Sequence, residues 1–168
     1  MRIIDEQLLK DLADQARRTP RRRKNLNLHT SYGDPCQRLL NALEPDTYVR
    51  PHRHLTPPKP ESFVALRGRM ALLVFDEGGA VADVVLFGAG GPVLGADIPP
   101  GVWHSIVCLE RGSVFFEAKP GPYEPLSDKD FAPWAPEEGR PESGEYLAFM
   151  RRAVDEMPGP GKAPDSCA

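Results

Sequence analysis

Residues 51–68 read PHRHLTPPKPESFVALRG and place two of the chain's four histidines, His52 and His54, two positions apart ahead of Glu61. Side chains two positions apart in a β-strand lie on one face, about 7 Å apart along the strand. If this segment is extended, His52 and His54 point the same way and Arg53 points to the opposite face. A proline-rich gap then leads to a second strand-like run that begins at Glu61. The stretch therefore predicts a β-hairpin that carries two imidazoles and one carboxylate on a shared face.

The same strand pattern repeats through the middle of the chain. Short apolar or alternating runs, separated by turn residues, occupy residues 25–29, 47–54, 61–67, 70–75, 80–87, 93–98, 102–108 and 113–119. The connections are too short for the crossover helices that parallel neighbours require, so we expect an antiparallel sheet. About eight such strands predict a β-barrel or jelly roll.

Three helices are expected around this barrel. Apolar residues recur every four positions in residues 3–16, which predicts an N-terminal amphipathic helix. Asp34-Pro35 resembles a helix start, and a short helix is expected from there to Glu44-Pro45, with its apolar face formed by Cys36, Leu39, Leu40 and Leu43. A last helix is expected to contain residues 146–154, preceded by a loop of ordered coil packed on the barrel.

The length of the chain, 168 residues, fits a single domain. The expected division is an N-terminal helix with a basic linker (1–24), the barrel (25–119), a packed loop with the C-terminal helix (120–156) and a disordered tail (157–168). Three widely spaced cysteines suggest neither a disulfide framework nor a cysteine zinc site. No apolar run approaches the roughly 20 residues needed to span a bilayer. We therefore expect a cytoplasmic protein that is not bound to a membrane.

Charge is unevenly distributed along the chain. The net charge of −3 argues against general nucleic-acid binding, but residues 17–24, RRTPRRRK, hold six of the 21 basic residues. The part of this run from Arg21 to Lys24 is either a solvated linker or a clamp for the phosphate of an anionic sugar or nucleotide, which guanidinium groups bind in a bidentate manner. The sequence leaves both interpretations open.

A third histidine is placed to join the first two. The turn Pro99-Pro100-Gly101 leads into a strand in which His104 shares a face with apolar neighbours. In a small barrel, His52, His54 and His104 can converge on one ion with bonds of about 2.1 Å, and Glu61 supplies a fourth ligand. Each histidine alone would be interpreted as a structural residue, but together they predict a metal site.

Two stretches, PHRHLTPPKPESFVALRG and IPPGVWH, resemble the two motifs of the cupin superfamily. Over roughly residues 20–150 the chain is similar to WbuC-type cupin metalloproteins, on the segments RRRKNLNLH, DPCQRLLNALEPDTYVRPHRH and KPGPYEPLSDKDFAPWAPEEG. The resemblance implies a double-stranded β-helix with a metal held by His52, His54, Glu61 and His104. It also implies an association with bacterial O-antigen and polysaccharide genes.

One departure from the general cupin motif concerns Glu61. The gap from His54 to Glu61, residues 55–60, is longer than in that motif, and a loop of different length can turn the carboxylate outward. The alternative for Glu61 is therefore a surface carboxylate that pairs with Lys59 or Arg67.

Further residues are candidates for contact with a substrate. If strand periodicity holds back to residue 48, Tyr48 and Arg50 share the inward face and orient the substrate, as an acid or an electrostatic clamp. Asn25, Asn27 and His29 share one face of the first predicted strand. They form either a polar outer surface or, as the N-x-N-x-H motif of the WbuC-type proteins implies, part of the barrel mouth.

The expected cofactor is one divalent transition metal ion, Fe, Mn, Ni or Zn. Four protein ligands would saturate tetrahedral zinc, whereas a metal that prefers six ligands would keep two positions for a substrate. The favoured function is a metal-dependent enzyme of oxygenase, isomerase or lyase type, acting on a small sugar-derived or carboxylated substrate of surface polysaccharide metabolism. The alternatives are a metal-bearing module that binds a small ligand without turnover, and a metal-free nucleotide-sugar isomerase or epimerase. A homodimer is the expected oligomer.

Overall fold

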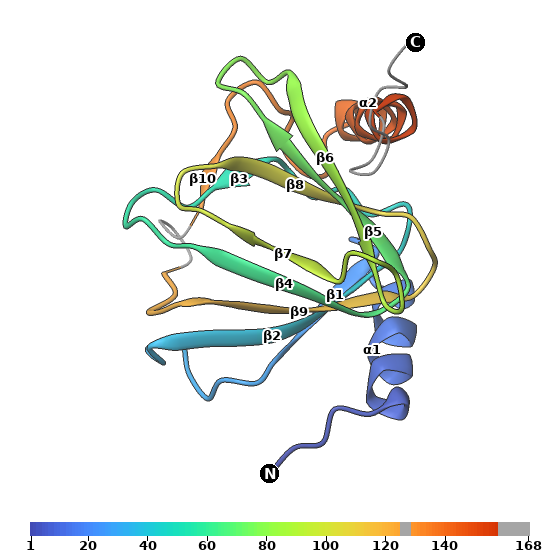
Figure 1. Ribbon diagram of the computed structural model, residues 1–168, viewed down its shortest axis with the longest axis vertical. Helices are drawn as coiled ribbons and strands as arrows, with labels where there is room; N and C mark the ends of the chain where they lie inside the picture. Colours follow the sequence, from blue (N-terminus) through green and yellow to red (C-terminus); the bar gives the residue numbers. More distant parts are fainter. Residues whose placement is uncertain (125–128, 158–168) are drawn as a thin grey trace, which may run out of the picture.

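The computed structural model describes residues 1–124 and 129–157, and their strands form two antiparallel sheets that face each other (Figure 1). One sheet has the order β1 (Arg23–Asn27), β2 (Cys36–Leu43), β9 (Ser113–Pro120), β4 (Glu61–Arg67) and β7 (Gly95–Ile98). The other has the order β10 (Asp130–Phe131), β3 (His52–Arg53), β8 (Trp103–Cys108), β5 (Arg69–Phe75) and β6 (Val81–Gly88). The predicted antiparallel β-barrel of the cupin kind is confirmed.

The short helix predicted between Asp34 and Glu44 is wrong. Residues 36–43 form strand β2, which pairs with β1 on one side and β9 on the other. Side chains on β2 alternate in direction, so Leu40 and Ala42 pack against the N-terminal helix while Leu39 and Asn41 line the barrel interior. Hydrogen bonding to two neighbouring strands outweighs the local Asp-Pro helix signal.

Two other segments differ from the expectation. The strand predicted for residues 47–54 is reduced to His52–Arg53, and residues 47–51 have no regular structure. Conversely, the loop expected to be coil contains the two-residue strand β10, in which Asp130 pairs with Arg53 and Phe131 pairs with His52. The loop thus completes the sheet edge beside His52.

The two helices, α1 (Glu6–Arg18) and α2 (Glu142–Glu156), lie on the outside of the barrel (Figure 1). Asp5 caps α1 by accepting a hydrogen bond of 2.9 Å from the backbone N–H of Leu8. The apolar face of α1 packs on β2 and β9 through a cluster of Leu9, Leu12, Ala13, Ala16, Leu40, Ala42 and Val114. Met150 and Val154 of α2 pack on the second sheet. No helix within the described ranges is long and apolar enough to cross a membrane.

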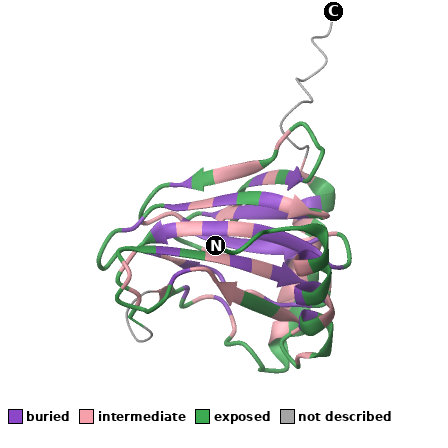
Figure 2. Ribbon diagram, turned by 90° about the horizontal axis from the view of Figure 1, so that it is seen from below, coloured by how far each residue is buried: buried purple, intermediate pink, exposed green. Residues whose placement is uncertain are grey.

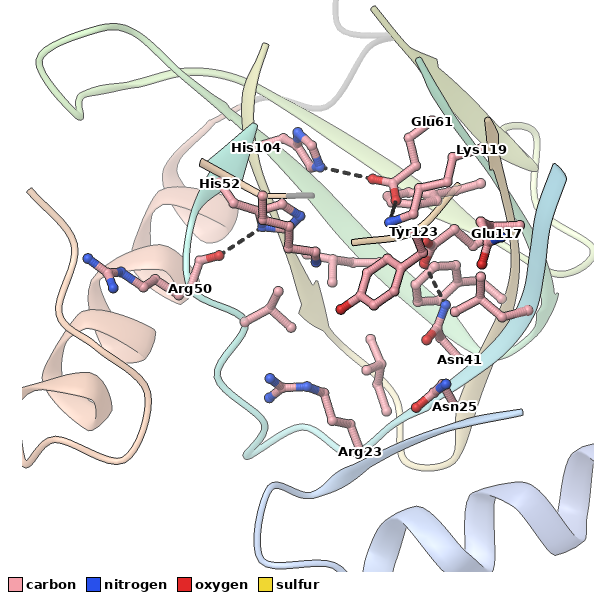
Figure 3. Close-up of a pocket in the computed structure, with 18 of the residues that line it drawn as sticks. Arg23, Asn25, Asn41, Arg50, His52, Glu61, His104, Glu117, Lys119 and Tyr123 are labelled. Atoms are coloured by element: carbon pink, nitrogen blue, oxygen red, sulfur yellow. Dashed lines mark hydrogen bonds and ion pairs between the residues drawn. The ribbon is translucent and has the colours of Figure 1, made fainter. Parts of the chain in front are cut away.

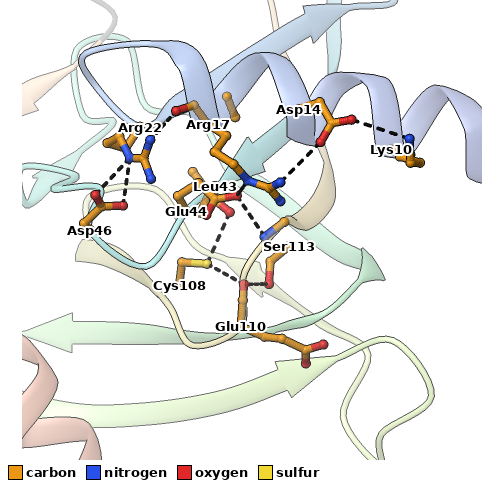
Figure 4. A network of polar contacts seen from close by, with 12 residues as sticks. Lys10, Asp14, Arg17, Arg22, Leu43, Glu44, Asp46, Cys108, Glu110 and Ser113 are labelled. Atoms are coloured by element: carbon orange, nitrogen blue, oxygen red, sulfur yellow. Dashed lines mark hydrogen bonds and ion pairs between the residues drawn. The ribbon is translucent and has the colours of Figure 1, made fainter.

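The barrel has one end that is closed by packing. Burial is concentrated in the strands and the connecting loops are largely exposed (Figure 2). An internal cluster that includes Leu43, Phe63, Met70, Leu72, Phe87, Ile106 and Phe115 fills the interior. Nearby, the fully buried Glu44 accepts hydrogen bonds from the backbone N–H of Gly112, at 3.1 Å, and from Arg17 of α1, at 3.4 Å (Figure 4). This network ties α1 to the ends of β2 and β9.

The predicted tail, residues 157–168, lies outside the described residues after Met157.

Candidate metal centre

The other part of the barrel interior is hollow. A cavity of about 730 Å³ lies between the two sheets and is lined by side chains from β1, β2, β3, β4, β8, β9 and the segment that contains β10. This volume is in the range of small-molecule sites. Figure 3 shows His52, His104 and Glu61 on one side of the cavity, with Lys119, Glu117 and Asn41 beside them.

The structure brings together the four residues predicted as metal ligands. His52 of β3 lies opposite His104 of β8 in the strand register, and Glu61 is the first residue of β4. The potential ligand atoms of these residues and His54 all lie within 4.8 Å of one another. All four side chains are buried, and Glu61 is only 2% exposed. Glu61 is therefore not the surface carboxylate of the alternative interpretation.

Backbone carbonyls fix the protonation of two of the imidazoles. The Nδ1 of His52 lies 2.9 Å from the carbonyl oxygen of Arg50, and the Nδ1 of His104 lies 2.9 Å from that of Val102. A carbonyl only accepts hydrogen bonds, so each Nδ1 carries a proton and donates it. When such a ring is neutral its lone pair is on Nε2, and the Nε2 of His104 faces Glu61. Metal-bound histidines in proteins are usually oriented in this way.

The donor set around Glu61 fits a cation. The Oε2 atom of Glu61 lies 3.2 Å from Nε2 of His104 and 3.5 Å from Nε2 of His54. In its neutral form, His104 presents a lone pair to a carboxylate oxygen, so two acceptors face each other unless a proton or a metal ion joins them. With bonds of about 2.1 Å, two ligands of the same ion lie about 3.0–3.4 Å apart. Three imidazoles and a carboxylate match the ligand preference of a divalent transition metal.

The site keeps its carboxylate charged and one of its imidazoles neutral. Burial raises the pKa of Glu61, but its close contacts with His104 and His54 and the charge of Lys119 outweigh it and leave the pKa well below its usual value. Burial, together with the nearby charge of Lys129, lowers the pKa of His52 well below that of a free imidazole. A neutral imidazole and an ionised carboxylate are the forms that bind metals.

A second group of polar residues adjoins the four candidate ligands. The ammonium group of Lys119 lies 3.3 Å from Oε1 of Glu61 and 3.3 Å from Oε1 of Glu117. Asn41 donates a hydrogen bond of 2.7 Å to Oε2 of Glu117. Burial and the charge of Glu61 raise the pKa of Glu117 to about 8. The sequence interpretation missed these three residues, although Glu117 and Lys119 alternate with Phe115 along a predicted strand.

The structure does not bring Tyr48 to the candidate ligands. Residues 47–51 are not a strand, so the periodicity that placed Tyr48 beside His52 fails. Tyr48 packs with Tyr146 of α2 and donates a hydrogen bond of 2.9 Å to the carbonyl oxygen of Pro136. It belongs to the hydrophobic cluster outside the barrel.

Arg50 lines the cavity, but its guanidinium group points away from His52 and His104 (Figure 3). It lies 5.2 Å from the centre of the Phe131 ring and donates a hydrogen bond of 2.9 Å to the carbonyl oxygen of Ala132. The part of Arg50 that serves the site is its backbone carbonyl, which orients His52.

The three possible substrate contacts of the first strand all line the cavity. Asn25 donates a hydrogen bond of 2.8 Å to the side-chain oxygen of Asn27. The Nδ1 of His29 lies 3.0 Å from both the backbone nitrogen and the carbonyl oxygen of Arg38, and its Nε2 has no hydrogen-bond partner among the described residues. These side chains lie at the cavity wall, and their contact with a substrate stays a prediction.

The basic run of residues 17–24 is partly engaged in ion pairs. Glu138 accepts two hydrogen bonds from Arg21, at 2.6 and 2.7 Å, and one from Arg23, at 2.6 Å. Arg21 and Arg23 also line the cavity. This arrangement joins the linker before β1 to the segment before α2.

The two facing antiparallel sheets give the protein a cupin-type fold, with the four candidate ligands buried inside it. Two solved structures with this fold are similar to the chain. CapF in complex with the inhibitor 3-isopropenyl-tropolone is 22% identical, with a TM-score of 0.50; the match covers 64% of this chain and 31% of that chain, so less than a third of the CapF chain is represented. L-ribose isomerase from Cellulomonas parahominis is 16% identical, with a TM-score of 0.51 and coverage of 67% and 70%. At such identities the likeness shows the fold alone.

The family assignment comes from the sequence. A family model described as a domain of unknown function, DUF6016, matches residues 4–87, and the chain belongs to this family. The match spans α1, the first strands and three of the four candidate ligands. A search of curated proteins found no match.

Proposed function

We propose that the protein is a metal-dependent cupin enzyme that acts on a small sugar-derived or carboxylated substrate. The observation that carries this proposal is the convergence of four buried ligand groups, with atoms within 4.8 Å of one another. Three of them, His52, Glu61 and His104, line a cavity of about 730 Å³. A structural metal site has no need of an adjoining cavity of this size.

His52, His54, Glu61 and His104 would hold the ion. A bound divalent transition metal would supply Lewis-acid or redox chemistry to a substrate in the cavity. Lys119 holds the Oε1 atom of Glu61 and leaves Oε2 directed at the histidines. The apolar side chains Phe63, Ile106 and Phe115 line the cavity and limit the access of water. The amide groups of Asn25 and Asn27 offer hydrogen bonds to substrate hydroxyl groups.

The proposed context is surface polysaccharide metabolism. The support for this context is the resemblance of residues 20–150 to WbuC-type cupin metalloproteins, which extends beyond the metal motif to β1 and to the loop that contains β10. A metal that accepts six ligands, such as Fe(II), Mn(II) or Ni(II), suits an enzyme because it keeps positions free for the substrate.

The proposal is tested by turnover. Metal-loaded protein, chelated protein and re-metallated protein are incubated with a panel of sugar acids and nucleotide sugars, and products are detected by mass spectrometry. We expect a product that disappears on chelation and returns with metal. A compound that raises the melting temperature of the metal-loaded protein without forming a product would support a binding module and contradict the enzyme.

A second candidate function is a metal-free isomerase or epimerase. The observation that favours it is the 3.2 Å contact between Nε2 of His104 and Oε2 of Glu61, a histidine–carboxylate pair suited to proton transfer. Activity that survives complete chelation would support this candidate, whereas activity that requires added metal would contradict it.

A further inference from the structure

The cavity contains an ammonium group without a matched acid. Lys129, just before β10, lines the cavity, and no hydrogen bond or ion pair joins its side chain to another residue in the described part of the chain. Its pKa is lowered by burial first and by the charge of Lys119 second. Lys129 lines the same cavity as His52, Glu61 and His104, and the charges of Glu61 and Glu117 act on its ammonium group.

The charges around this group do not balance once a metal is bound. Without metal, the ammonium groups of Lys119 and Lys129 face the carboxylate of Glu61 and the carboxyl group of Glu117, whose pKa is raised to about 8, so the acids do not offset more than the two ammonium charges. A divalent cation on the four ligands, as in the proposed function on which this inference rests, adds two positive charges to the same partly buried space. A buried excess of charge is costly unless a counter-charge is present. The missing counter-charge is best supplied by a ligand that is itself an anion.

The part of the cavity wall formed by β1 and β2 has a different chemistry. Asn25, Asn27 and Asn41 come from β1 and β2, and the register places Asn25 directly opposite Asn41. Each amide has two N–H donors and an oxygen acceptor, and the side-chain hydrogen bonds from Asn25 to Asn27 and from Asn41 to Glu117 use only some of them. Rows of amides with remaining donors and acceptors suit a ligand that has several hydroxyl groups.

We propose that the cavity binds a small polyhydroxylated anion whose carboxylate or phosphate group is held by Lys129 beside the metal ligands. The hydroxyl groups of this ligand face the wall formed by Asn25, Asn27 and Asn41. Lys129 is then the residue that selects charged over neutral sugars, because an ammonium group paired with an anion in a partly buried site forms a strong, charge-assisted hydrogen bond.

The test is isothermal titration calorimetry of the metal-loaded protein with three probes: D-gluconate, D-glucose 6-phosphate and D-glucose. At least one anion is expected to bind about 10- to 100-fold more tightly than glucose. Comparison of gluconate with glucose 6-phosphate shows whether a carboxylate or a phosphate is preferred. The preference should be lost in Lys129→Gln and kept in Lys24→Gln, a matched control because Lys24 is exposed on β1 and does not line the cavity.

Elemental analysis of the same samples separates this inference from the proposed function. If metal is bound and neither anion binds more tightly than glucose, or if Lys129→Gln keeps the preference, the inference is wrong and the metal site stands. If the wild type binds no metal, the proposed function fails. Calorimetry of the metal-free protein and its Lys129→Gln variant then still decides whether Lys129 selects anions.

Discussion

The imidazoles of His52 and His104 are oriented by the same kind of hydrogen bond to the backbone. In each case the Nδ1–H donates to the carbonyl oxygen of the residue two positions earlier, Arg50 or Val102, at 2.9 Å. Because the two histidines also lie opposite each other in neighbouring strands, the two rings enter the cavity side by side, with centroids 4.6 Å apart. The side chain of Arg50 is thus less important to the site than its backbone.

Glu61 is the residue whose role is most directly tested by a conservative change. Glu61→Gln keeps the shape of the side chain but removes the charge that His104, His54 and Lys119 surround. We expect metal affinity to fall by about 100-fold, since a neutral amide is a much weaker ligand than a carboxylate. Competition with a coloured chelator measures this. Glu110→Gln, at an exposed acid paired with Arg69, is the control, and equal affinities in the two variants would exclude Glu61 as a ligand.

The sequence predicted the candidate ligands because two motifs are local in the chain. His52 and His54 are separated by one residue, and the turn Pro99-Pro100-Gly101 comes shortly before His104. Glu117, Lys119 and Lys129 were not found, because their proximity to Glu61 depends on the closure of the barrel. Tyr48 was misplaced because strand periodicity was extended into a segment that is not a strand.

At the scale of elements, the predicted strand bounds agree best with the observed ones where glycine or proline residues separate the strands. The run expected at 61–67 is β4 with the same limits, and those expected at 70–75 and 113–119 extend by one residue in β5 and β9. The helix predicted in place of β2 was wrong because no glycine or proline within residues 36–43 marks the segment as a strand. The spacing of its leucines suits both the period of a helix and that of a strand. Its pairing with β1 and with β9, which is distant in sequence, selects the strand.

A substitution at Gly95 tests the close pairing of β7 with β4. A Cβ atom at this position would lie 1.9 Å from the carbonyl oxygen of Phe63, an impossible contact with backbone atoms. Gly95→Ala should therefore push β7 away from β4 and lower the free energy of unfolding by about 2–3 kcal/mol in urea denaturation. Gly144→Ala in α2, where a Cβ meets nothing within 4 Å, should leave stability unchanged or raise it by up to about 1 kcal/mol. Equal effects would contradict this packing.

Glu138 tests the connection between the basic linker and the segment before α2. Burial raises its pKa, but hydrogen bonds from Arg21 and Arg23 lower it overall. A carboxylate with a lowered pKa stabilises the fold above its unfolded pKa of about 4.3, and this contribution is lost as the pH falls through the folded value.

Glu138→Gln should therefore reduce stability by about 1 kcal/mol at pH 7, and the difference from wild type should vanish in acid. Urea denaturation between pH 7 and pH 3 measures both effects. Glu137→Gln, at an exposed acid that forms an ion pair with Arg140 three positions away, should match the wild type at every pH. If the difference in free energy of unfolding between wild type and Glu138→Gln stayed constant from pH 7 to pH 3, the charge of Glu138 would not be the source of the stabilisation.

At the scale of the whole molecule, the barrel is divided between packing and function. One part of its interior is filled by apolar side chains, and the buried Glu44 network ties α1 to that end. The other part is the cavity, which is lined by three of the four candidate ligands, His52, Glu61 and His104. Fold class was predictable from strand spacing alone, whereas the distribution of polar groups in the cavity depends on strand order, which one sequence does not reveal.

The central claim is that His52, His54, Glu61 and His104 hold one metal ion. It is tested most directly by the metal content of wild type, a His52→Ala/His54→Ala double variant and a His29→Ala control, all purified without chelator. His29 lines the same cavity but is not among the four ligands. We predict about one ion per chain in wild type and control, and far less in the double variant, with circular dichroism unchanged. A double variant that retains its metal, or a wild type without metal, would contradict the account.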